Sequence, residues 1–466
     1  MSGLLIRDAE VDGRRCSARV RDGRVAELGP GLARASGEEE VDAAGGALLP
    51  GLTDHHLHLF ALAAALSSVR CGPPDVRDRA ALRAALHRAA PDRHGWVRGI
   101  GYDERVAGSL DAAGLDALRA DVPVRVQHRS GALWVLNSRA AERVSLTHGR
   151  HPGIEKDAAG QPTGRVWRAD DWLRERLPGA VAPSLATVGR RLAGYGITAV
   201  TDATPRLTAR AFATLAAEAD SGRLPQRLLL LGAPLGTPST ARPEPGPWKI
   251  VLPDSGLPDF DRLTEEIDAA HRRGRPVAVH TVTAVSLALL LAALEETGVL
   301  PGDRVEHAAV VPAEAVPVVR RLGLRVVTQP GFLSDRGDDF LDGSPPHEQA
   351  DLYRCASFLR GGVPLALSSD APYGPLDPWS VIRAAATRHV PGGRTANPAE
   401  RVTAAEALNS YLSSPHSPGS PPPRLRPGSP ADLVLLAVPL ADALSHPSAG
   451  LVRLTLIEGR VCHTGF

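Results

Sequence analysis

The stretch "ALLPGLTDHHLH", residues 47–58, ends an apolar run with two histidines that are two positions apart. Residues i and i+2 of an extended chain point to the same side. His56 and His58 can therefore reach one metal ion as neutral nitrogen ligands. The same spacing also occurs on surface loops, but the apolar strand before it favours the metal interpretation. His55 is expected to point the opposite way and either to have a structural role or to support the ligand residues without binding the metal.

Seven further β-rich runs follow this one, and helix-like segments lie between most of them. The runs are "GITAVTDA", "RLLLLGAP", "WKIVLP", "PVAVHTV", "RVEHAAVV", "RVVTQP" and "PLALSSDAP". Eight βα units over this length predict an α/β fold of the (β/α)8 barrel type, in which catalytic residues come from the C-terminal ends of the strands. A doubly wound open sheet is the alternative, but no switch-point crevice is marked in the sequence.

Polar residues stand at the ends of several predicted strands. Lys249 lies in the fourth, His280 and His307 end the fifth and sixth, and Asp370 follows the eighth. Each histidine alone fits a barrel interior, and Asp370 alone fits a turn or helix cap. Together with the histidine pair they predict a metal site, in which Asp370 binds the ion and accepts a proton from its water.

The two ends of the chain have a strand-and-turn pattern in place of the strand-and-helix alternation of its middle. Residues 1–50 and 417–466 read as short strands with Gly turns, and paired across the termini they predict one composite β-sandwich domain. The Pro/Ser-rich stretch 413–430 marks the connector. The barrel is expected over 51–416. The gap at 70–180 is too long for one helix and predicts an inserted α/β capping subdomain over the barrel mouth.

Composition excludes several classes of function. The 466 residues contain 53 basic and 52 acidic residues, and no basic run or aromatic-interleaved patch points to nucleic acid. The apolar runs are too short for a membrane span, and the N-terminus does not resemble a secretory signal. The four cysteines form no CxxC pair, as expected of reduced thiols in a cytoplasmic protein. The expected partner is a small-molecule substrate, and a homodimer is the default oligomer.

Motifs along nearly the whole chain resemble those of the amidohydrolase superfamily, and specifically its amidohydrolase-3 or YtcJ-like subgroup. "LLPGLTDHHLHL" is similar to that group's "PGxxDxHxH" start. The other similar segments are "GWVRGIGYDE", "RSGALWVLNSRAA", "DAAGQPTGRV", "YGITAVTDA", "RVEHAAVV", "ALSSDAPYGPLDPW" and "GSPADLVLL".

The resemblance implies roles for the residues at the strand ends. His56 and His58 would hold a more buried divalent ion, and His280 and His307 a more exposed one. Asp370 would be both ligand and general base. Four histidines favour zinc, although iron, manganese and cobalt accept the same ligands.

Lys249 is one of only two lysines, beside 51 arginines. It falls where some members of the superfamily carry an N6-carboxylysine that bridges two ions. A lysine amine whose pKa is lowered by burial can become an anionic carbamate, whereas arginine stays charged. A snorkelling lysine is the alternative.

Several positions in and around the predicted pocket depart from the family pattern. Ala132 stands where the family has a histidine, and "HTVTAVS" places Thr283 and Ala284 where a Gly-Asp pair is usual. The chemistry is therefore expected to be conserved and the substrate unusual. Candidates to face the substrate, with core packing as the alternative, are Tyr102, Asp103, Trp134 and Asn137.

These features predict a metal-dependent hydrolase acting on carbon–nitrogen bonds other than peptide bonds. A metal-activated hydroxide would attack an amide or cyclic amide carbonyl, with Asp370 as general base. Two alternatives remain open: a deaminase of heterocycles with one metal ion, and a metal-binding homologue that has lost catalysis.

Overall fold

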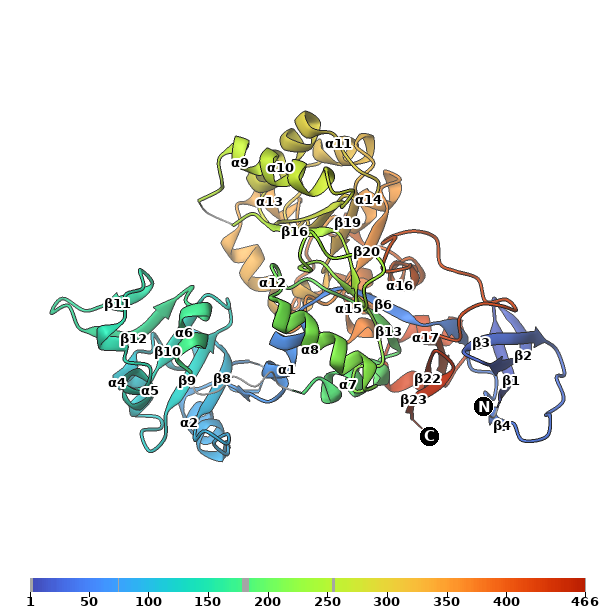
Figure 1. The fold of residues 1–466 in the computed structure, drawn as a ribbon, viewed down its shortest axis with the longest axis horizontal. Coiled ribbons are helices and arrows are strands. Elements are labelled where there is room, and N and C mark those ends of the chain that lie inside the picture. Colours follow the sequence, from blue (N-terminus) through green and yellow to red (C-terminus); the bar gives the residue numbers. More distant parts are fainter. Residues whose placement is uncertain (1–2, 74, 178–183, 254–255, 466) are drawn as a thin grey trace. The chain divides into compact units, whose positions relative to one another are not determined.

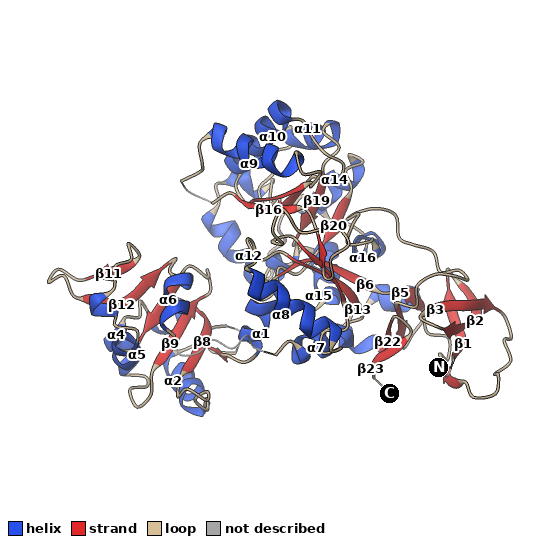
Figure 2. Cartoon of the chain, in the orientation of Figure 1, coloured by secondary structure: helices blue, strands red, loops and turns tan. Residues whose placement is uncertain are grey.

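A computed structural model describes residues 3–73, 75–177, 184–253 and 256–465. The chain divides into two compact units (Figures 1 and 2). The first, unit 1, comprises Met1–Leu59 and Ser184–Phe466, and the second, unit 2, comprises Phe60–Pro183. The insertion predicted at 70–180 lies within unit 2.

Unit 1 contains two sheets of parallel strands. The first has the order β15-β14-β13-β6, and its strands are β6 (Leu52–Leu57), β13 (Ile197–Asp202), β14 (Arg227–Leu230) and β15 (Glu244–Pro245). The second keeps the chain order β16-β17-β18-β19-β20, and its strands are β16 (Trp248–Val251), β17 (Val277–Thr281), β18 (Arg304–His307), β19 (Arg325–Thr328) and β20 (Leu365–Leu367). All eight predicted runs therefore contain strands, and the fold is mixed α/β.

Strand pairing in the described residues does not join the two sheets into a closed barrel, so the closed form of the prediction is not observed. A few backbone hydrogen bonds connect the two sheets instead. The Lys249 amide donates to the Leu231 carbonyl over 3.1 Å, and the Asp370 amide donates to the His56 carbonyl over 2.8 Å. Pro245 and Pro247 supply no N–H at the first junction, and β20 is only three residues long, so neither edge supports a longer ladder.

Helices lie between and after these strands, and most of them bury apolar side chains. They are α7 (Ala186–Gly194), α8 (Ala209–Asp220), α9 (Phe260–His271), α10 (Ala284–Thr297), α11 (Ala315–Arg321), α12 (Gly331–Gly343), α13 (Pro346–Gln349), α14 (Cys355–Arg360), α15 (Pro378–Thr387), α16 (Ala404–Leu412) and α17 (Leu440–Ser445). Thr283 caps α10 in a capping box with Ser286, which gives the departure "HTVTAVS" a local structural reason.

The two chain ends lie side by side in unit 1. One sheet has the order β3-β2-β1-β4 and comprises β1 (Leu4–Val11), β2 (Arg14–Arg21), β3 (Arg24–Gly29) and β4 (Glu39–Asp42). The other has the order β23-β22-β21-β5 and comprises β5 (Leu48–Pro50), β21 (Leu433–Leu436), β22 (Val452–Ile457) and β23 (Arg460–Thr464). Both sheets contribute to one hydrophobic cluster, for example through Ile6 and Leu435. A separate sandwich domain stays a prediction.

Unit 2 is built on a six-stranded sheet of order β11-β12-β10-β9-β8-β7. Its elements are α1 (Leu59–Leu66, entering from unit 1), β7 (Val69–Arg70), α2 (Arg79–Arg88), β8 (Val97–Tyr102), α3 (Glu104–Ala107), α4 (Ala112–Asp116), β9 (Val124–His128), β10 (Leu133–Leu136), α5 (Ser138–Arg143), β11 (Ile154–Lys156), β12 (Pro162–Trp167) and α6 (Asp170–Arg176). Val135 and Trp134 of β10 enter different hydrophobic clusters, as alternation along a strand requires.

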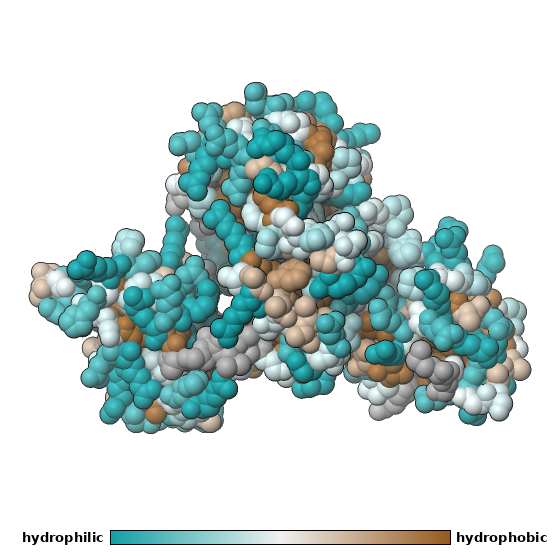
Figure 3. Space-filling view, viewed as in Figure 1, coloured by the Kyte–Doolittle hydropathy of each residue, from teal (hydrophilic) through white to brown (hydrophobic). Residues whose placement is uncertain are grey.

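The described residues include no helix that is long and apolar enough to cross a membrane. Hydrophilic side chains cover most of the face seen in Figure 3, and hydrophobic residues form small groups between them.

The Pro/Ser-rich connector packs against the second parallel sheet, and this gives a matched test. Gly419 has φ +75°, and a Cβ there would lie 2.3 Å from the Leu365 backbone nitrogen; Gly428 has φ +89° and open space around it. Both Ala substitutions place a side chain in the left-handed region, at a cost of about 1–2 kcal/mol. We expect Gly419→Ala to cost about 1–3 kcal/mol more than Gly428→Ala, measured by calorimetric unfolding. Equal effects would contradict this packing.

Candidate metal centre

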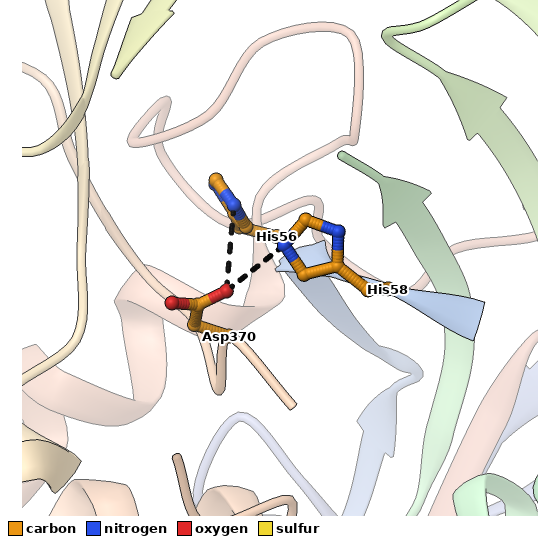
Figure 4. Close-up of side chains that lie close together, drawn as sticks. All are labelled: His56, His58 and Asp370. Carbon is orange, nitrogen blue, oxygen red and sulfur yellow. Dashed lines mark ion pairs between the residues drawn. The ribbon is translucent and has the colours of Figure 1, made fainter. Parts of the chain in front are cut away.

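His56 in β6, His58 directly after that strand and one aspartate after β20 meet in unit 1 (Figure 4). The His58 Nε2 lies 3.2 Å from the Asp370 Oδ1, and the His56 Nε2 lies 3.6 Å from the same oxygen. One ligand atom from each residue lies within 4.8 Å of the others. The hydrogen bond from the Asp370 amide to the His56 carbonyl holds the two segments in this register.

The atoms of this group suit a divalent cation. His56 Nε2 and Asp370 Oδ1 are buried and have no hydrogen-bond partner among the described residues. Burial, and after it the charge of Lys249, lowers the pKa of His56 well below its usual value. The imidazole is therefore neutral and has a lone pair to offer. Imidazole nitrogen and carboxylate oxygen are ligands that zinc and related ions accept.

Glu306 orients His56 and was not predicted from the sequence as a site residue. The Nδ1 of His56 donates a hydrogen bond to the Glu306 carboxylate, which leaves Nε2 as the ligand atom. Arg304 forms an ion pair with the other carboxylate oxygen over 2.5 Å, and both side chains are buried. Arg304 and Glu306 are two positions apart on β18 and so share a face. The only signal in the sequence was a charged pair at this spacing inside an apolar strand.

The other two predicted histidines lie beside the first pair. The His307 ring centroid is 4.4 Å from that of His280 and 4.6 Å from that of His56. The His307 Nδ1 donates to Gln329 Oε1 over 2.9 Å, so its Nε2 is the available nitrogen. Gln329 was also missed from the sequence. Burial lowers the pKa of His280 to about 3 and that of His307 well below its usual value.

Lys249 lies within β16, and its side chain is buried. Its Nζ has no hydrogen-bond partner among the described residues. Burial lowers the pKa of this amine to about 8, while the charges of Glu306 and Asp370 act in the opposite direction. Burial of an ammonium without a partner is costly, and the lowered pKa leaves a larger fraction of the amine neutral near pH 7 than an exposed lysine has.

Three non-glycine residues at two strand ends have left-handed backbone conformations, which are common at functional sites. His307, Ala308 and Asp370 have φ of +70°, +46° and +52°. Non-glycine residues in this region cost of order 1–3 kcal/mol each, and they gather where the surrounding structure imposes a geometry.

Two neighbours of the histidine pair hold the loop in place. The Asp54 Oδ1 accepts hydrogen bonds from the amides of His56 and Ser369, each over 3.2 Å. Burial raises the pKa of Asp54 to about 7. His55 is buried, and its Nε2 lies 3.1 Å from the Ser413 Oγ, consistent with the structural role expected for it.

The four residues predicted to face the substrate all lie in unit 2, and the predicted metal ligands all lie in unit 1. Tyr102 is buried and donates to the Gly108 carbonyl over 2.5 Å. Asp103 caps α3 and forms an ion pair with Arg105. Their role toward a substrate stays a prediction.

Trp134 and Asn137 are buried in the same unit and also have structural partners. The Trp134 indole donates to Asp170 over 2.9 Å. Asn137 caps α5 and makes further hydrogen bonds to the backbone. Ala132, the departure from the family pattern, accepts a hydrogen bond from the Arg168 amide through its carbonyl.

Comparison with known proteins yields one family. The model of the amidohydrolase family matches residues 39–463. The N-substituted formamide deformylase of Arthrobacter pascens is 27% identical over 494 aligned positions, covering 90% of each chain. The Arabidopsis thaliana protein LONG AFTER FAR-RED 3 is 25% identical, covering 95% of this chain and 88% of its own.

A solved structure has a similar fold along the whole chain. An uncharacterized metal-dependent hydrolase from Pyrococcus horikoshii superimposes with a TM-score of 0.75 at 19% identity, covering 99% of this chain and 100% of that one.

Replacing Glu306 by Gln tests the orientation of His56. The amide keeps the size of the carboxylate and removes its charge, so His56 becomes a weaker ligand and Arg304 loses its counter-charge. We expect affinity for a divalent ion to fall about 10- to 100-fold, measured by competition with a chelator. The exposed Glu314→Gln is the control. Unchanged affinity in Glu306→Gln would exclude the role assigned to Glu306.

Asn137→Ala separates a structural from a substrate-contacting role. The change leaves the Val124 amide and the carbonyls of Arg119 and Val122 without their buried partner. Unfolding free energy should fall by about 3 kcal/mol or more, measured with denaturant. Asn409→Ala, on an exposed helix position, should change it by about 0.5 kcal/mol or less. Unchanged stability with an altered KM would instead favour the substrate role.

Proposed function

Because this chain belongs to the amidohydrolase family, we propose that it is a metal-dependent hydrolase that cleaves the C–N bond of an amide or cyclic amide. The observation that carries the proposal is the convergence of His56, His58 and Asp370 on one point with ligand atoms left unpartnered. The family and its C–N hydrolase relatives support the reaction class.

The proposal also covers the arrangement of the sheets in unit 1. The two parallel sheets would be the two parts of one (β/α)8 barrel, and the terminal sheets would form a sandwich beside it. The hydrogen bonds from Lys249 to Leu231 and from Asp370 to His56 support the barrel, because they connect the end of β14 with β16, and β6 with the turn after β20, between the two sheets.

His56, His58 and Asp370 would hold one divalent ion, and His280 and His307 a second. Zinc is the expected ion because neutral imidazoles dominate the set. Such ions, when bound, polarise a carbonyl oxygen as Lewis acids and make a water molecule acidic near neutral pH.

Lys249 would connect the two ion positions as a carbamate. Its neutral amine attacks carbon dioxide, a C–N bond forms, and one proton leaves to solvent, which gives an anionic ligand. The lowered pKa of the amine and its lack of a partner support this step. Arginine could not take this role, because its guanidinium remains protonated.

Asp370 would move the proton of the reaction. Its carboxylate would accept a proton from the attacking water and deliver it to the leaving nitrogen, so that the amine departs neutral. Asp370 is suited to this because its Oδ2 lies 3.8 Å from the His307 Nδ1 and its Oδ1 faces His58. Removing the carboxylate would therefore affect both metal binding and proton transfer.

The substrate would be a small amide, with residues of unit 2 covering it. N-substituted formamides are the first class to test, because the relative from Arthrobacter pascens is named for them.

Bound metal per chain tests the proposal. The wild type should contain about two ions by elemental analysis, and Lys249→Ala one or fewer, with amide hydrolysis lost. Lys156→Ala is a matched control, since Lys156 is the only other lysine and is exposed. Bicarbonate should increase the activity of metal-depleted enzyme reloaded with zinc, and Lys249→Ala should not respond.

Other metal counts would change the conclusion. About one ion in both proteins would make Lys249 a bystander and favour the deaminase with one metal ion. No bound ion after growth with zinc, manganese and iron would contradict the hydrolase proposal itself.

A further inference from the structure

Arg336 lies inside α12 with its guanidinium over two aromatic rings. The guanidinium carbon is 4.4 Å from the Phe332 ring centroid and 5.8 Å from that of Phe340. Arg336 is also where α12 departs from helical geometry, with φ −144° and ψ 27°. Tyr353 completes the group, with its ring 6.3 Å from Phe332 and 5.9 Å from Phe340.

Arg336 has no carboxylate partner among the residues that the structure describes. Its Nε is buried without any hydrogen-bond acceptor. Arg394, which pairs with the same helix, differs: it binds Asp338 and Asp342 over 2.8 Å each. A guanidinium held against rings is oriented by them, and its remaining N–H groups can bind a planar anion.

This aromatic group adjoins the two strand ends that carry the metal ligands. The Tyr353 amide donates to the carbonyl of Ala309, two residues after His307. The Phe332 ring lies 3.1 Å from where a Cβ of Gly374 would be, in the turn that follows Asp370. The charges of Arg336 and Asp370 both act on the Tyr353 hydroxyl: Arg336 lowers its pKa and Asp370 raises it.

We infer that Arg336 binds a carboxylate group of the substrate, and that the rings around it receive an apolar group next to that carboxylate. Resting on the function proposed above, this makes the substrate an amide that carries a carboxylate, such as an N-acyl amino acid with a large apolar side chain. One guanidinium neutralises one carboxylate. A dianionic phosphate would leave a charge uncompensated beside apolar rings and Asp370.

The first test measures binding without turnover. The probes are 3-phenylpropanoate and 3-phenylpropan-1-ol, which share ring and chain length and contain no C–N bond. We expect the metal-loaded enzyme to bind the carboxylate more tightly by calorimetry, and Arg336→Met to weaken that binding about 10- to 100-fold while leaving the alcohol unchanged. Arg336→Lys should restore part of the loss. Arg394→Met removes ion pairs from the same helix and should change neither.

The second test uses turnover of N-formyl-L-phenylalanine and of N-(2-phenylethyl)formamide, which lacks the carboxylate. Arg336→Met should raise KM for the first with a smaller change in kcat, and should leave both parameters for the second near wild type. Hydrolysis of both compounds by the wild type with no preference for the carboxylate would overturn the role of Arg336 and leave the proposed function standing.

Two further outcomes are decisive. Equal weakening of both probes by Arg336→Met, or the same loss in Arg394→Met, would show a structural role and overturn the inference. Arg336-dependent binding of 3-phenylpropanoate in an enzyme that hydrolyses no amide would support the carboxylate site and contradict the proposed function.

Discussion

The candidate site depends on the register between two segments that are far apart in the chain, the end of β6 and the turn after β20. The Asp370 amide donates to the His56 carbonyl, and the His58 amide donates to the Ala371 carbonyl. These two hydrogen bonds hold the Asp370 segment beside β6, where the carboxylate lies near both imidazoles, and Asp370 itself has a positive φ. Because side chains alternate along an extended chain, a slip of one residue would direct His55 to the site in place of His56.

Burial has a chemical consequence at this site as well as a structural one. It makes the imidazoles of His56, His280 and His307 poor bases, so they remain neutral nitrogen donors. The same burial would make the Glu306 carboxylate costly if Arg304 did not pair with it. The ion pair therefore allows a buried acceptor to fix the His56 tautomer. Lys249 is the member of the set that burial leaves without any partner among the described residues, and this is why its modification is chemically reasonable.

Unit 1 contains the candidate metal ligands, their supporting residues and the aromatic group with Arg336. The residues that sequence motifs placed near the substrate belong to unit 2, where Asn137 and Trp134 already satisfy buried polar groups. Motifs shared by relatives thus include residues that a fold needs for its own stability. An arginine that has no carboxylate partner among the described residues, and that rests on rings near the candidate metal ligands, is a more specific indication of substrate chemistry than a motif match is.

The sequence by itself determined eight of the nine strands in the two parallel sheets, the histidine pair at the end of β6, and the polar residues at or after the ends of β17, β18 and β20. Alternation and apolar runs are local patterns, and they are legible without knowledge of the fold. Only the tertiary structure decided that Glu306 holds His56, that Gln329 holds His307, and that the strands pair as two sheets without continuous closure. The first two contacts depend on which side chains of different strands lie next to each other. The missing closure depends on the prolines near β15 and on the three-residue length of β20, which limit hydrogen bonding between the two sheets. Such contacts leave no pattern in a short stretch of sequence, because the two partners lie in different elements and only tertiary packing brings them together.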